Sequence, residues 1–287
     1  MRAYVPNYRV VSPSDLSEAL SLIAREPDVW KPFAGGTDLM VLLEAGKLLH
    51  QNYLNIWNLN ELRGIEVSDS HVTMGALTTY TQVQSHPVLQ SEFGMLCQAA
   101  SETGGLAIQN RGTVGGNIVN ASPAADSPPA LLAYDAELEL ASTGEKRWIP
   151  YHGFHTGYKQ MTLRSDELLT RIRLPRPKRK RLEHYRKVGT RKAQAISKIC
   201  FAGTAALEDG AIADVRIVFG SVAPVPLRCV ETEAALRGQK INATTAAQQT
   251  LANEIVPIDD IRSTKNYRLQ VSLNLLEDFL SRIASQA

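Results

Sequence analysis

Two pairs of adjacent glycines are the residues of this sequence best suited to binding a ligand. The first pair lies in F-A-G-G-T-D-L-M at 33–40, and the second lies about eighty residues later in T-V-G-G-N at 113–117. Because glycine has no Cβ, its backbone N–H groups can approach a phosphate closely, and glycine also permits a turn at positive φ. Two separated loops of this kind would suit the two phosphates of a dinucleotide.

The side chains beside these pairs fit the same chemistry. Thr37 and Thr113 offer hydroxyls near a pyrophosphate, and Asp126, which follows the second pair, could accept hydrogen bonds from hydroxyl or amino groups. Adjacent glycines also occur in plain tight turns, which is the alternative for each loop. Neither loop is G-x-G-x-x-G or ends in the Lys-Ser/Thr of a P-loop, so both of those nucleotide folds are disfavoured. The sequence does not decide which loop would take which phosphate.

Composition excludes several classes of protein. The chain has 287 residues, 44% of them hydrophobic, and is long enough for two domains. No apolar run approaches the roughly 20 residues of a membrane span, and the start M-R-A-Y-V-P-N-Y lacks the core of a signal peptide, so we expect no membrane and a cytoplasmic protein. The three cysteines form no C-x-x-C, and the six histidines form no H-E-x-x-H, so no disulfide framework or metal site is indicated.

Charge is balanced overall but concentrated in one segment. The net charge is +2, which gives no general reason to expect nucleic acid as a partner. Between 171 and 192, however, eleven of twenty-two residues are Lys or Arg, including K-R-K-R at 178–181 directly after P-R-P at 175–177. A nucleic-acid or localisation signal is one interpretation. Clustered charge on a Pro-rich connector is more typical of a solvated linker, and it would also suit a surface facing a partner subunit.

Secondary-structure patterns place both glycine pairs next to regular elements. A helix is expected after Ser12-Pro13-Ser14-Asp15, with Pro13 in its first turn and Pro27 at its end. Strand-like residues at 29–34 and a helical run at 38–45 make a strand-loop-helix unit around the first pair. The second pair ends a Gly-rich segment at 103–116. Other expected strands are 52–59, 65–67, 72–76, 137–141 and 168–174, and other expected helices are 88–102 and 128–134.

The C-terminal part has strands first and helices afterwards. Two strands are expected at 199–207 and 215–222, followed by helices at about 228–237, 243–254 and 264–284. The last helix would bury a stripe made of Leu269, Leu273, Leu276 and Leu280. Strands that are followed by helices indicate an α+β fold.

At its two glycine loops the sequence resembles the FAD-binding (medium) subunits of molybdenum hydroxylases, the family of xanthine dehydrogenase and carbon monoxide dehydrogenase. A-G-G-T-D-L at 34–39 and T-V-G-G-N at 113–117 match that family's pyrophosphate loops. H-T-G-Y-K at 155–159, D-E-L-L-T-R-I-R-L-P at 166–175 and Y-R-K-V-G-T-R-K-A-Q-A-I-S at 185–197 resemble its later landmarks. The resemblance covers nearly all of the chain, which makes it more specific than any single motif.

The resemblance implies a two-part FAD-binding domain of the PCMH/VAO-like type, followed by a small α+β domain with a sheet and helices. We expect the FAD-binding domain at 1–176, with subdomains at about 1–55 and 56–176, and the C-terminal domain at 177–287. Non-covalent FAD is the implied cofactor, since neither loop contains a His for a covalent link. The implied cofactor-binding residues are Pro32, Phe33, Ala34, Gly35, Gly36, Thr37, Asp38, Leu39, Thr113, Val114, Gly115, Gly116, Asn117, Asp126 and Lys187.

Two residues are placed near the flavin ring by the resemblance alone. Lys187 would lie near the flavin, where a fixed cation stabilises negative charge on the reduced ring, and Ile196 would lie beside the isoalloxazine. Without the resemblance, Lys187 would be one more residue of a basic linker and Ile196 an ordinary core residue. Thr103 stands where animal xanthine dehydrogenases carry an aromatic residue, so stacking would come from elsewhere or be absent. No cysteine cluster marks the additional iron–sulfur insertion of one branch of the family.

The implied function is electron transfer within a xanthine dehydrogenase-like, molybdopterin-dependent enzyme. Electrons would pass from two-iron two-sulfur clusters on a small subunit to this FAD, and then to NAD or another acceptor. A large subunit would hold molybdopterin and the organic substrate, so the chain would work in a hetero-oligomer. Two alternatives are a self-sufficient flavin oxidoreductase of the wider PCMH-type fold and an interaction protein without flavin.

Overall fold

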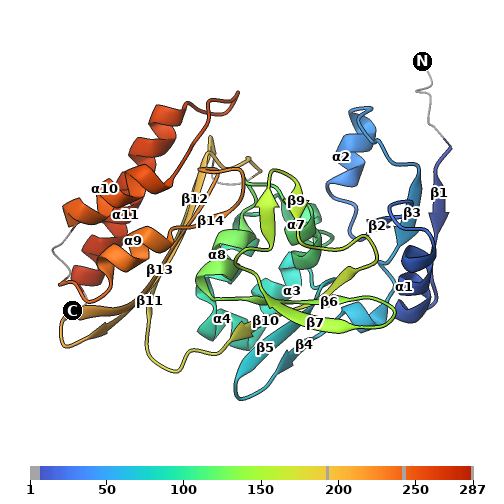
Figure 1. The fold of residues 1–287 in the computed structure, drawn as a ribbon, viewed down its shortest axis with the longest axis horizontal. Helices are drawn as coiled ribbons and strands as arrows, with labels where there is room; N and C mark the ends of the chain where they lie inside the picture. Colours follow the sequence, from blue (N-terminus) through green and yellow to red (C-terminus); the bar gives the residue numbers. More distant parts are fainter. Residues whose placement is uncertain (1–6, 192–193, 241–243, 286–287) are drawn as a thin grey trace.

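The computed structural model describes residues 7–191, 194–240 and 244–285. Figure 1 shows an elongated molecule with a small sheet at the N-terminal end, a second sheet and a group of short helices in the middle, and a helical layer at the C-terminal end. The mixture of separate sheets and helices confirms the α+β class. Within the described ranges, no helix combines the length and the apolar character that crossing a membrane requires.

The N-terminal sheet is parallel, with strand order β1-β3-β2. Asp15 caps the first helix by accepting a 2.8 Å hydrogen bond from the Glu18 amide, and the helix buries Ala19, Leu20 and Ile23. The sequence analysis expected Pro13 in the first turn of this helix, but Pro13 precedes the cap and lies outside the helix. The elements are β1 (Arg9–Val11), α1 (Leu16–Arg25), β2 (Lys31–Phe33), α2 (Leu39–Glu44) and β3 (Asn52–Asn55).

The middle sheet is antiparallel, with order β4-β5-β10-β6-β7. Its strands are β4 (Ile65–Val67), β5 (His71–Gly75), β6 (Glu137–Ala141), β7 (Lys146–Pro150) and β10 (Leu168–Pro175), preceded by the 3-10 helix η1 (Asn60–Leu62). Six helices are α3 (Tyr80–Ser85), α4 (Pro87–Glu92), α5 (Gly94–Glu102), α6 (Leu106–Gln109), α7 (Val114–Val119) and α8 (Ser127–Ala133). A short hairpin, β8 (His155–Gly157) and β9 (Gln160–Met161), lies beside α7, where His155 Nε2 contacts Ile118 O at 2.9 Å.

Two expectations for these helices were wrong. The helix expected at 88–102 is divided into α4 and α5, because the buried ring of Phe93 packs edge-on against Tyr134 at the break. The segment 103–116, expected to be a Gly-rich loop, contains α6 and the first turn of α7.

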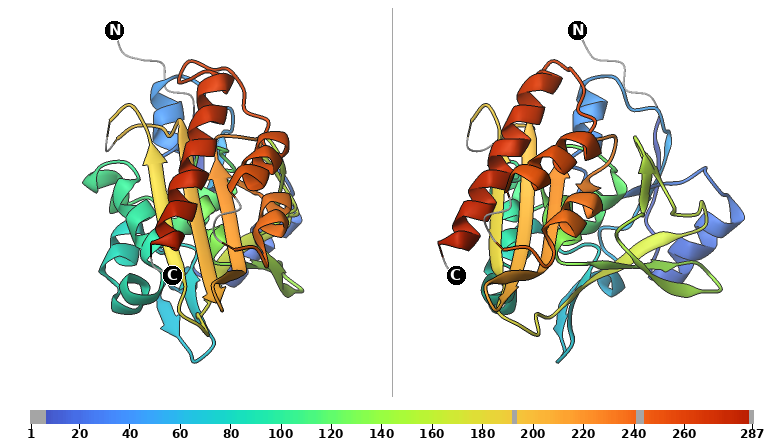
Figure 2. Two further views of the ribbon diagram at one scale, coloured as in Figure 1. Left: turned by 90° about the vertical axis from the view of Figure 1, so that its left-hand side faces the viewer. Right: turned by 60° about the vertical axis from the view of Figure 1, so that its left-hand side comes forward.

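The C-terminal sheet is buried on both faces. Along β12, Cys200 and Ala202 face the core shared with α5 and α8, whereas Ile199 and Phe201 face the core beneath the C-terminal helices. Figure 2 shows α11 lying across the outer face of this sheet. The antiparallel order is β11-β12-β13-β14, from β11 (Leu182–Val188), β12 (Ile199–Glu208), β13 (Ala211–Gly220) and β14 (Leu227–Arg228). The covering helices are α9 (Val230–Leu236), α10 (Thr244–Glu254) and α11 (Lys265–Ala284).

The buried stripe of α11 differs from the expected one. Leu276 and Leu280 are buried as expected, together with Phe279 and Ile283, but Leu269 and Leu273 are only partly buried.

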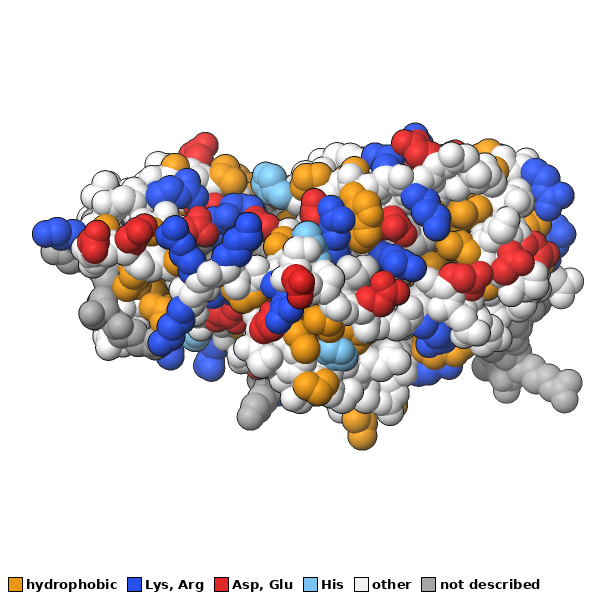
Figure 3. Space-filling model, turned by 90° about the horizontal axis from the view of Figure 1, so that it is seen from below, with side chains coloured by type: hydrophobic (Ala, Val, Ile, Leu, Met, Phe, Trp, Pro, Cys, Tyr) orange, Lys and Arg blue, Asp and Glu red, His pale blue; other side chains and the backbone are white. Residues whose placement is uncertain are grey.

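Most of the basic segment is strand and not linker. Residues 171–175 belong to β10 and 182–188 to β11, so only 176–181 connect the two sheets. Arg173 pairs with Glu137 at 2.5 Å, and Arg176 pairs with Glu92. On the face shown in Figure 3, Lys and Arg side chains gather on the left half with Asp and Glu among them. We propose 1–176 and 177–287 as the domain limits, with the division falling in this connection.

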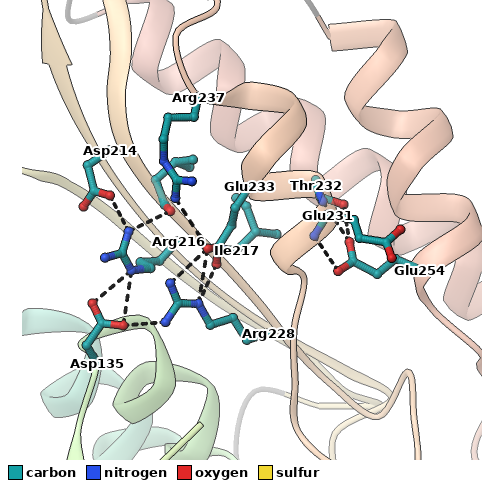
Figure 4. Close-up of polar contacts among 11 residues, drawn as sticks. Asp135, Asp214, Arg216, Ile217, Arg228, Glu231, Thr232, Glu233, Arg237 and Glu254 are labelled. Carbon is teal, nitrogen blue, oxygen red and sulfur yellow. Dashed lines mark hydrogen bonds and ion pairs between the residues drawn. The ribbon is translucent and has the colours of Figure 1, made fainter. Parts of the chain in front are cut away.

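A polar network joins the two halves of the molecule (Figure 4). Asp135, two residues after the end of α8, accepts hydrogen bonds from Arg216 at 2.9 Å and from Arg228 at 2.5 Å. Arg228 also contacts Glu233 of α9 at 2.9 Å, and the amide of Ile217 donates to the same carboxylate at 3.0 Å. These contacts fix α8, β13, β14 and α9 relative to one another.

Candidate functional site

The first glycine pair forms a half-buried loop between β2 and α2, with backbone donors left over. Gly36 has a φ of +78°, which favours glycine. A Cβ on Gly35 would lie 1.8 Å from the carbonyl oxygen of Arg111, so this glycine allows the loop to pack against the segment before the second pair. The amides of Gly35, Gly36 and Thr37 donate to no other described backbone group. Three consecutive uncommitted donors fit an anionic oxygen.

The second glycine pair lies in the first turn of α7. Thr113 caps this helix by accepting a 3.1 Å hydrogen bond from the Gly116 amide, while the Gly115 amide donates to Ala76 O at 3.0 Å. A Cβ on Gly115 would lie 2.6 Å from Ala76 Cβ, so close packing alone requires a glycine here. From the sequence we expected both amides to face a ligand. In the structure they donate within the protein, so the donors available to a phosphate are those of the first loop.

Side chains connect the two glycine segments directly. Asn120, at the end of α7, donates from Nδ2 to Asp38 Oδ1 at 3.3 Å. Lys159 Nζ donates to Asn120 O at 2.6 Å and to Asn120 Oδ1 at 2.8 Å. Partial burial lowers the pKa of Lys159, and the carboxylate of Asp38 opposes that change. Sequence reasoning missed Asn120 and Lys159, although Lys159 ends the H-T-G-Y-K landmark.

Asp126 and Lys187 form a buried ion pair. Lys187 Nζ lies 2.7 Å from Asp126 Oδ2 and 2.8 Å from the carbonyl oxygen of Glu102, the last residue of α5. The Lys187 side chain is 2% exposed and the Asp126 side chain 10%. Burial raises the pKa of the Asp126 carboxyl, while Lys187 and the Ser197 hydroxyl oppose the rise. An ammonium has three donors, and these two contacts use two of them.

The turn between β11 and β12 adds two neighbouring residues to this pair. Ser197 is buried, and its hydroxyl donates to Asp126 Oδ1 at 2.5 Å. Ile196, the preceding residue, is 56% exposed, so it is not the ordinary core residue that the sequence offered as an alternative. Lys187 is likewise not a solvated linker residue. Ser197 was missed as a site residue, and its position directly after Ile196 was the only sequence signal.

The sequence-predicted residues therefore form two neighbouring groups. Residues 32–39 and 113–117 make the first, and Asp126, Lys187 and Ile196 make the second. Ser127, the residue after Asp126, links the groups by donating to Asn117 Oδ1 at 2.7 Å.

The remaining predicted position and the metal alternative concern residues outside these groups. Thr103 is the C-cap residue of α5, and its hydroxyl donates to Ala99 O at 2.7 Å; a threonine has no ring that could stack on the cofactor. In the part of the chain that the structure describes, no cluster of His, Cys, Asp and Glu side chains could hold a metal ion.

Comparison with known proteins identifies the class to which this fold and site belong. The family described as the FAD binding domain in molybdopterin dehydrogenase matches residues 6–177. The CO dehydrogenase flavoprotein C-terminal domain matches residues 183–283. The chain is therefore a member of the FAD-binding subunits of molybdenum hydroxylases, which confirms the family, the α+β fold and FAD as the cofactor of its class.

Individual relatives match along almost their entire length. The chain is 34% identical over 276 residues to the xanthine dehydrogenase FAD-binding subunit of Escherichia coli O157:H7, covering 95% of this chain and 93% of the relative. It is 30% identical over 273 residues to the glyceraldehyde dehydrogenase medium chain of Sulfolobus acidocaldarius, covering 93% and 95%. A solved carbon monoxide dehydrogenase of Hydrogenophaga pseudoflava superimposes with a TM-score of 0.91 at 26% identity, covering 96% of each chain. These relatives are parts of dehydrogenases, so the chain is an oxidoreductase subunit.

Proposed function

We propose that this chain is the electron-transfer subunit of a xanthine dehydrogenase-like molybdenum hydroxylase. The observation that carries the proposal is the set of uncommitted amides at Gly35, Gly36 and Thr37 beside the two glycine segments. They would hold the pyrophosphate of FAD, with 32–39 and 113–117 around it. The bound flavin would supply the redox chemistry.

The Asp126–Lys187 pair would set the electrostatic environment of the flavin. Lys187 is held by Asp126 and by the carbonyl at the end of α5, so its charge is fixed in position. Both Asp126 oxygens already accept hydrogen bonds, which suits a positioning role better than proton abstraction. Ile196, exposed on the adjoining turn, would face the ring. We assign no acid or base residue to this chain.

The partners are proposed from the family. An iron–sulfur subunit would deliver electrons to this chain, and a molybdopterin subunit would oxidise the organic substrate. NAD or another acceptor would take the electrons from the flavin. Relatives named as a medium chain or as an FAD-binding subunit support a hetero-oligomer, and the cytoplasm is the proposed location.

The visible spectrum of the purified chain tests the cofactor, and turnover tests the role. We expect a yellow protein that binds FAD in preference to FMN, because a pyrophosphate is what the loops would hold. The isolated chain should not oxidise purines or aldehydes. When it is co-purified with its two partners, such a substrate should reduce the flavin. Ordinary turnover of an organic substrate by the isolated chain would instead establish a self-sufficient oxidoreductase, and a colourless protein would contradict both.

A further inference from the structure

A chain of hydrogen bonds runs from the Asp126–Lys187 pair to the C-terminal helical layer. Ser197 donates to Asp126 Oδ1, and the Ser221 hydroxyl donates to the carbonyl oxygen of Ser197 at 3.2 Å. Arg268 of α11 then donates from one guanidinium nitrogen to the carbonyl oxygen of Ser221 at 3.4 Å. Its other terminal nitrogen donates to Asp260 Oδ1 at 2.7 Å. All of these donors and acceptors lie in the described part of the chain.

Ser221 is the point at which this chain meets the segment that bears Asp126. Its amide donates to the carbonyl oxygen of Pro123 at 2.8 Å, three residues before Asp126. Ser221 therefore touches both the Asp126 segment and the turn that carries Ser197. It has a φ of +67°, in the left-handed region that a serine seldom adopts. Such a conformation is strained and persists only where surrounding contacts impose it.

Arg268 has the burial expected of a residue with a specific task. Its side chain is 4% exposed, and its Nε has no hydrogen-bond partner among the described residues. A guanidinium is costly to bury, so its two directed contacts, one to Ser221 and one to Asp260, are what compensate it. An apolar side chain at this position on the buried face of α11 would not carry that cost.

We propose that Arg268 is a positioning residue for the cofactor site and acts on Asp126 and Lys187 through Ser221 and Ser197. This proposal rests on the proposed function, because Asp126 and Lys187 would be positioned for the bound FAD. The C-terminal helical layer would then tune how FAD is held, although α11 contributes none of the predicted cofactor-binding residues.

FAD affinity and the absorption spectrum of the bound flavin test this role in the full chain. Arg268→Met should weaken FAD binding about threefold to tenfold, the effect of losing one directed hydrogen bond, and should shift the flavin absorption. Arg268→Lys should restore part of the affinity, because its ammonium can still donate to the carbonyl oxygen of Ser221. The control is Arg282→Met on the same helix, where an exposed Arg pairs with Asp278 at 2.8 Å, and it should change neither quantity.

A double substitution separates positioning from a general loss of stability. Ser197→Ala removes the hydroxyl that Arg268 is proposed to position, so adding Arg268→Met should weaken FAD by less than twofold more. If the losses of FAD affinity in the two single variants multiply in the double variant, the proposal is overturned. A folded Arg268→Met chain with wild-type FAD affinity and flavin spectrum would also overturn it.

A second variant decides the matter if Arg268→Met does not fold. Ser221→Gly removes the hydroxyl and relieves the positive φ, so it should weaken FAD while the melting temperature of the apo chain stays equal or rises. Unchanged FAD affinity there would also overturn the proposal. If the wild-type chain binds no FAD, the proposed function itself is contradicted. If the wild-type chain binds FAD and the variants bind it equally well, only the role of Arg268 is contradicted.

Discussion

Lys187 Nζ lies 2.7 Å from Asp126 Oδ2, although the two residues are 61 positions apart in the sequence. The pair connects β11, in the C-terminal sheet, to the N-cap residue of α8, the helix that packs against β12 and β13. Because both side chains are buried, removing one partner leaves the other charge without compensation. The site and the joint between the two halves of the molecule therefore depend on the same contact.

Lys187→Met should destabilise the apo chain in a pH-dependent way. Without the ammonium, burial would keep the folded-state pKa of Asp126 above its unfolded value near 3.9. A carboxyl whose pKa is higher in the folded state than in the unfolded state stabilises the fold at pH values below the unfolded-state pKa. This stabilisation is lost as the pH rises through the folded-state pKa. The variant should thus lose about 3 to 5 kcal/mol at pH 8 and recover much of it near pH 4. Denaturant unfolding at both pH values measures this.

The double variant Lys187→Met/Asp126→Asn is the matched control for that experiment. Removing both charges should restore stability at pH 8 while FAD binding stays weak. If Lys187→Met alone loses the same stability at both pH values, the ion pair does not explain the loss.

Gly35→Ala should lose both stability and FAD. The added Cβ would lie 1.8 Å from the Arg111 carbonyl oxygen, and no side-chain rotation can relieve a clash between backbone segments. We expect a loss of about 1 to 3 kcal/mol in unfolding experiments and little bound flavin. Gly144→Ala, where a Cβ would meet nothing within 4 Å, is the control and should behave as the wild type. Full flavin content in Gly35→Ala would show that the first loop is not the phosphate site.

Asp260 should make the chain sensitive to acid. Burial alone would raise the pKa of this carboxyl, but hydrogen bonds from Arg268, Arg262 and Ser263 outweigh it and hold the pKa well below the usual range. A depressed folded-state pKa gives stability that is present above about pH 4 and is lost as pH falls towards the folded value. Asp260→Asn should therefore cost about 2 kcal/mol at pH 7 and much less near pH 2. An equal cost at both pH values would contradict this assignment.

Arg228→Met should weaken the joint shown in Figure 4. Glu233 has a side chain that is only 3% exposed, and without Arg228 its nearest cation is Arg237 at 4.0 Å. Leaving a buried carboxylate poorly paired costs about 3 to 5 kcal/mol in unfolding free energy. Arg179→Met removes a 71% exposed partner of Glu208 and should cost less than about 1 kcal/mol. Similar losses in the two variants would mean that burial of Glu233 does not control the effect.

The sequence was most informative where local chemistry decides the structure. The strand, the loop and the helix around the first glycine pair follow from residue types between 29 and 45, and β2 and α2 lie there. The second pair was expected in a Gly-rich loop, yet Thr113 caps α7 there and the tight packing of Gly115 on Ala76 admits only a glycine. The helical conformation of the second pair depends on packing against a distant segment, and that contact cannot be identified from a single sequence.

One strand and several site residues could not be predicted from the local sequence. β11 was read as linker because its Lys and Arg residues masked the alternation around Tyr185, whose ring is buried. Asn120, Lys159 and Ser197 have no local motif of their own. Each is defined by a contact with a segment between 39 and 82 positions away, and only the fold creates that contact.

The last prediction concerns the connector at 176–181 and the assembly. Beside it lies an open groove of about 480 Å³, lined by Arg179, Lys180 and Arg181 together with Glu92 and Glu183. Glu92 and Glu183 pair with Arg176 and Arg181, and Arg179 pairs with Glu208, so Lys180 is the lining cation that no ion pair of the described residues engages. Such a surface would attract an acidic segment of a partner, with an attraction that salt weakens.

Charge reversal at exposed positions tests this docking role without disturbing the fold. Lys178→Glu/Lys180→Glu changes two exposed side chains and spares Arg181, which stacks on Tyr134 at 4.4 Å. The isolated variant should keep its FAD and its melting temperature. Co-purification with the proposed iron–sulfur and molybdopterin subunits should fall several-fold at low salt, and substrate should reduce the flavin more slowly. Lys146→Glu on β7 reverses an exposed charge away from the connector and should assemble normally. Unchanged assembly of the double variant at low salt would show that the connector is solvated and takes no part in docking.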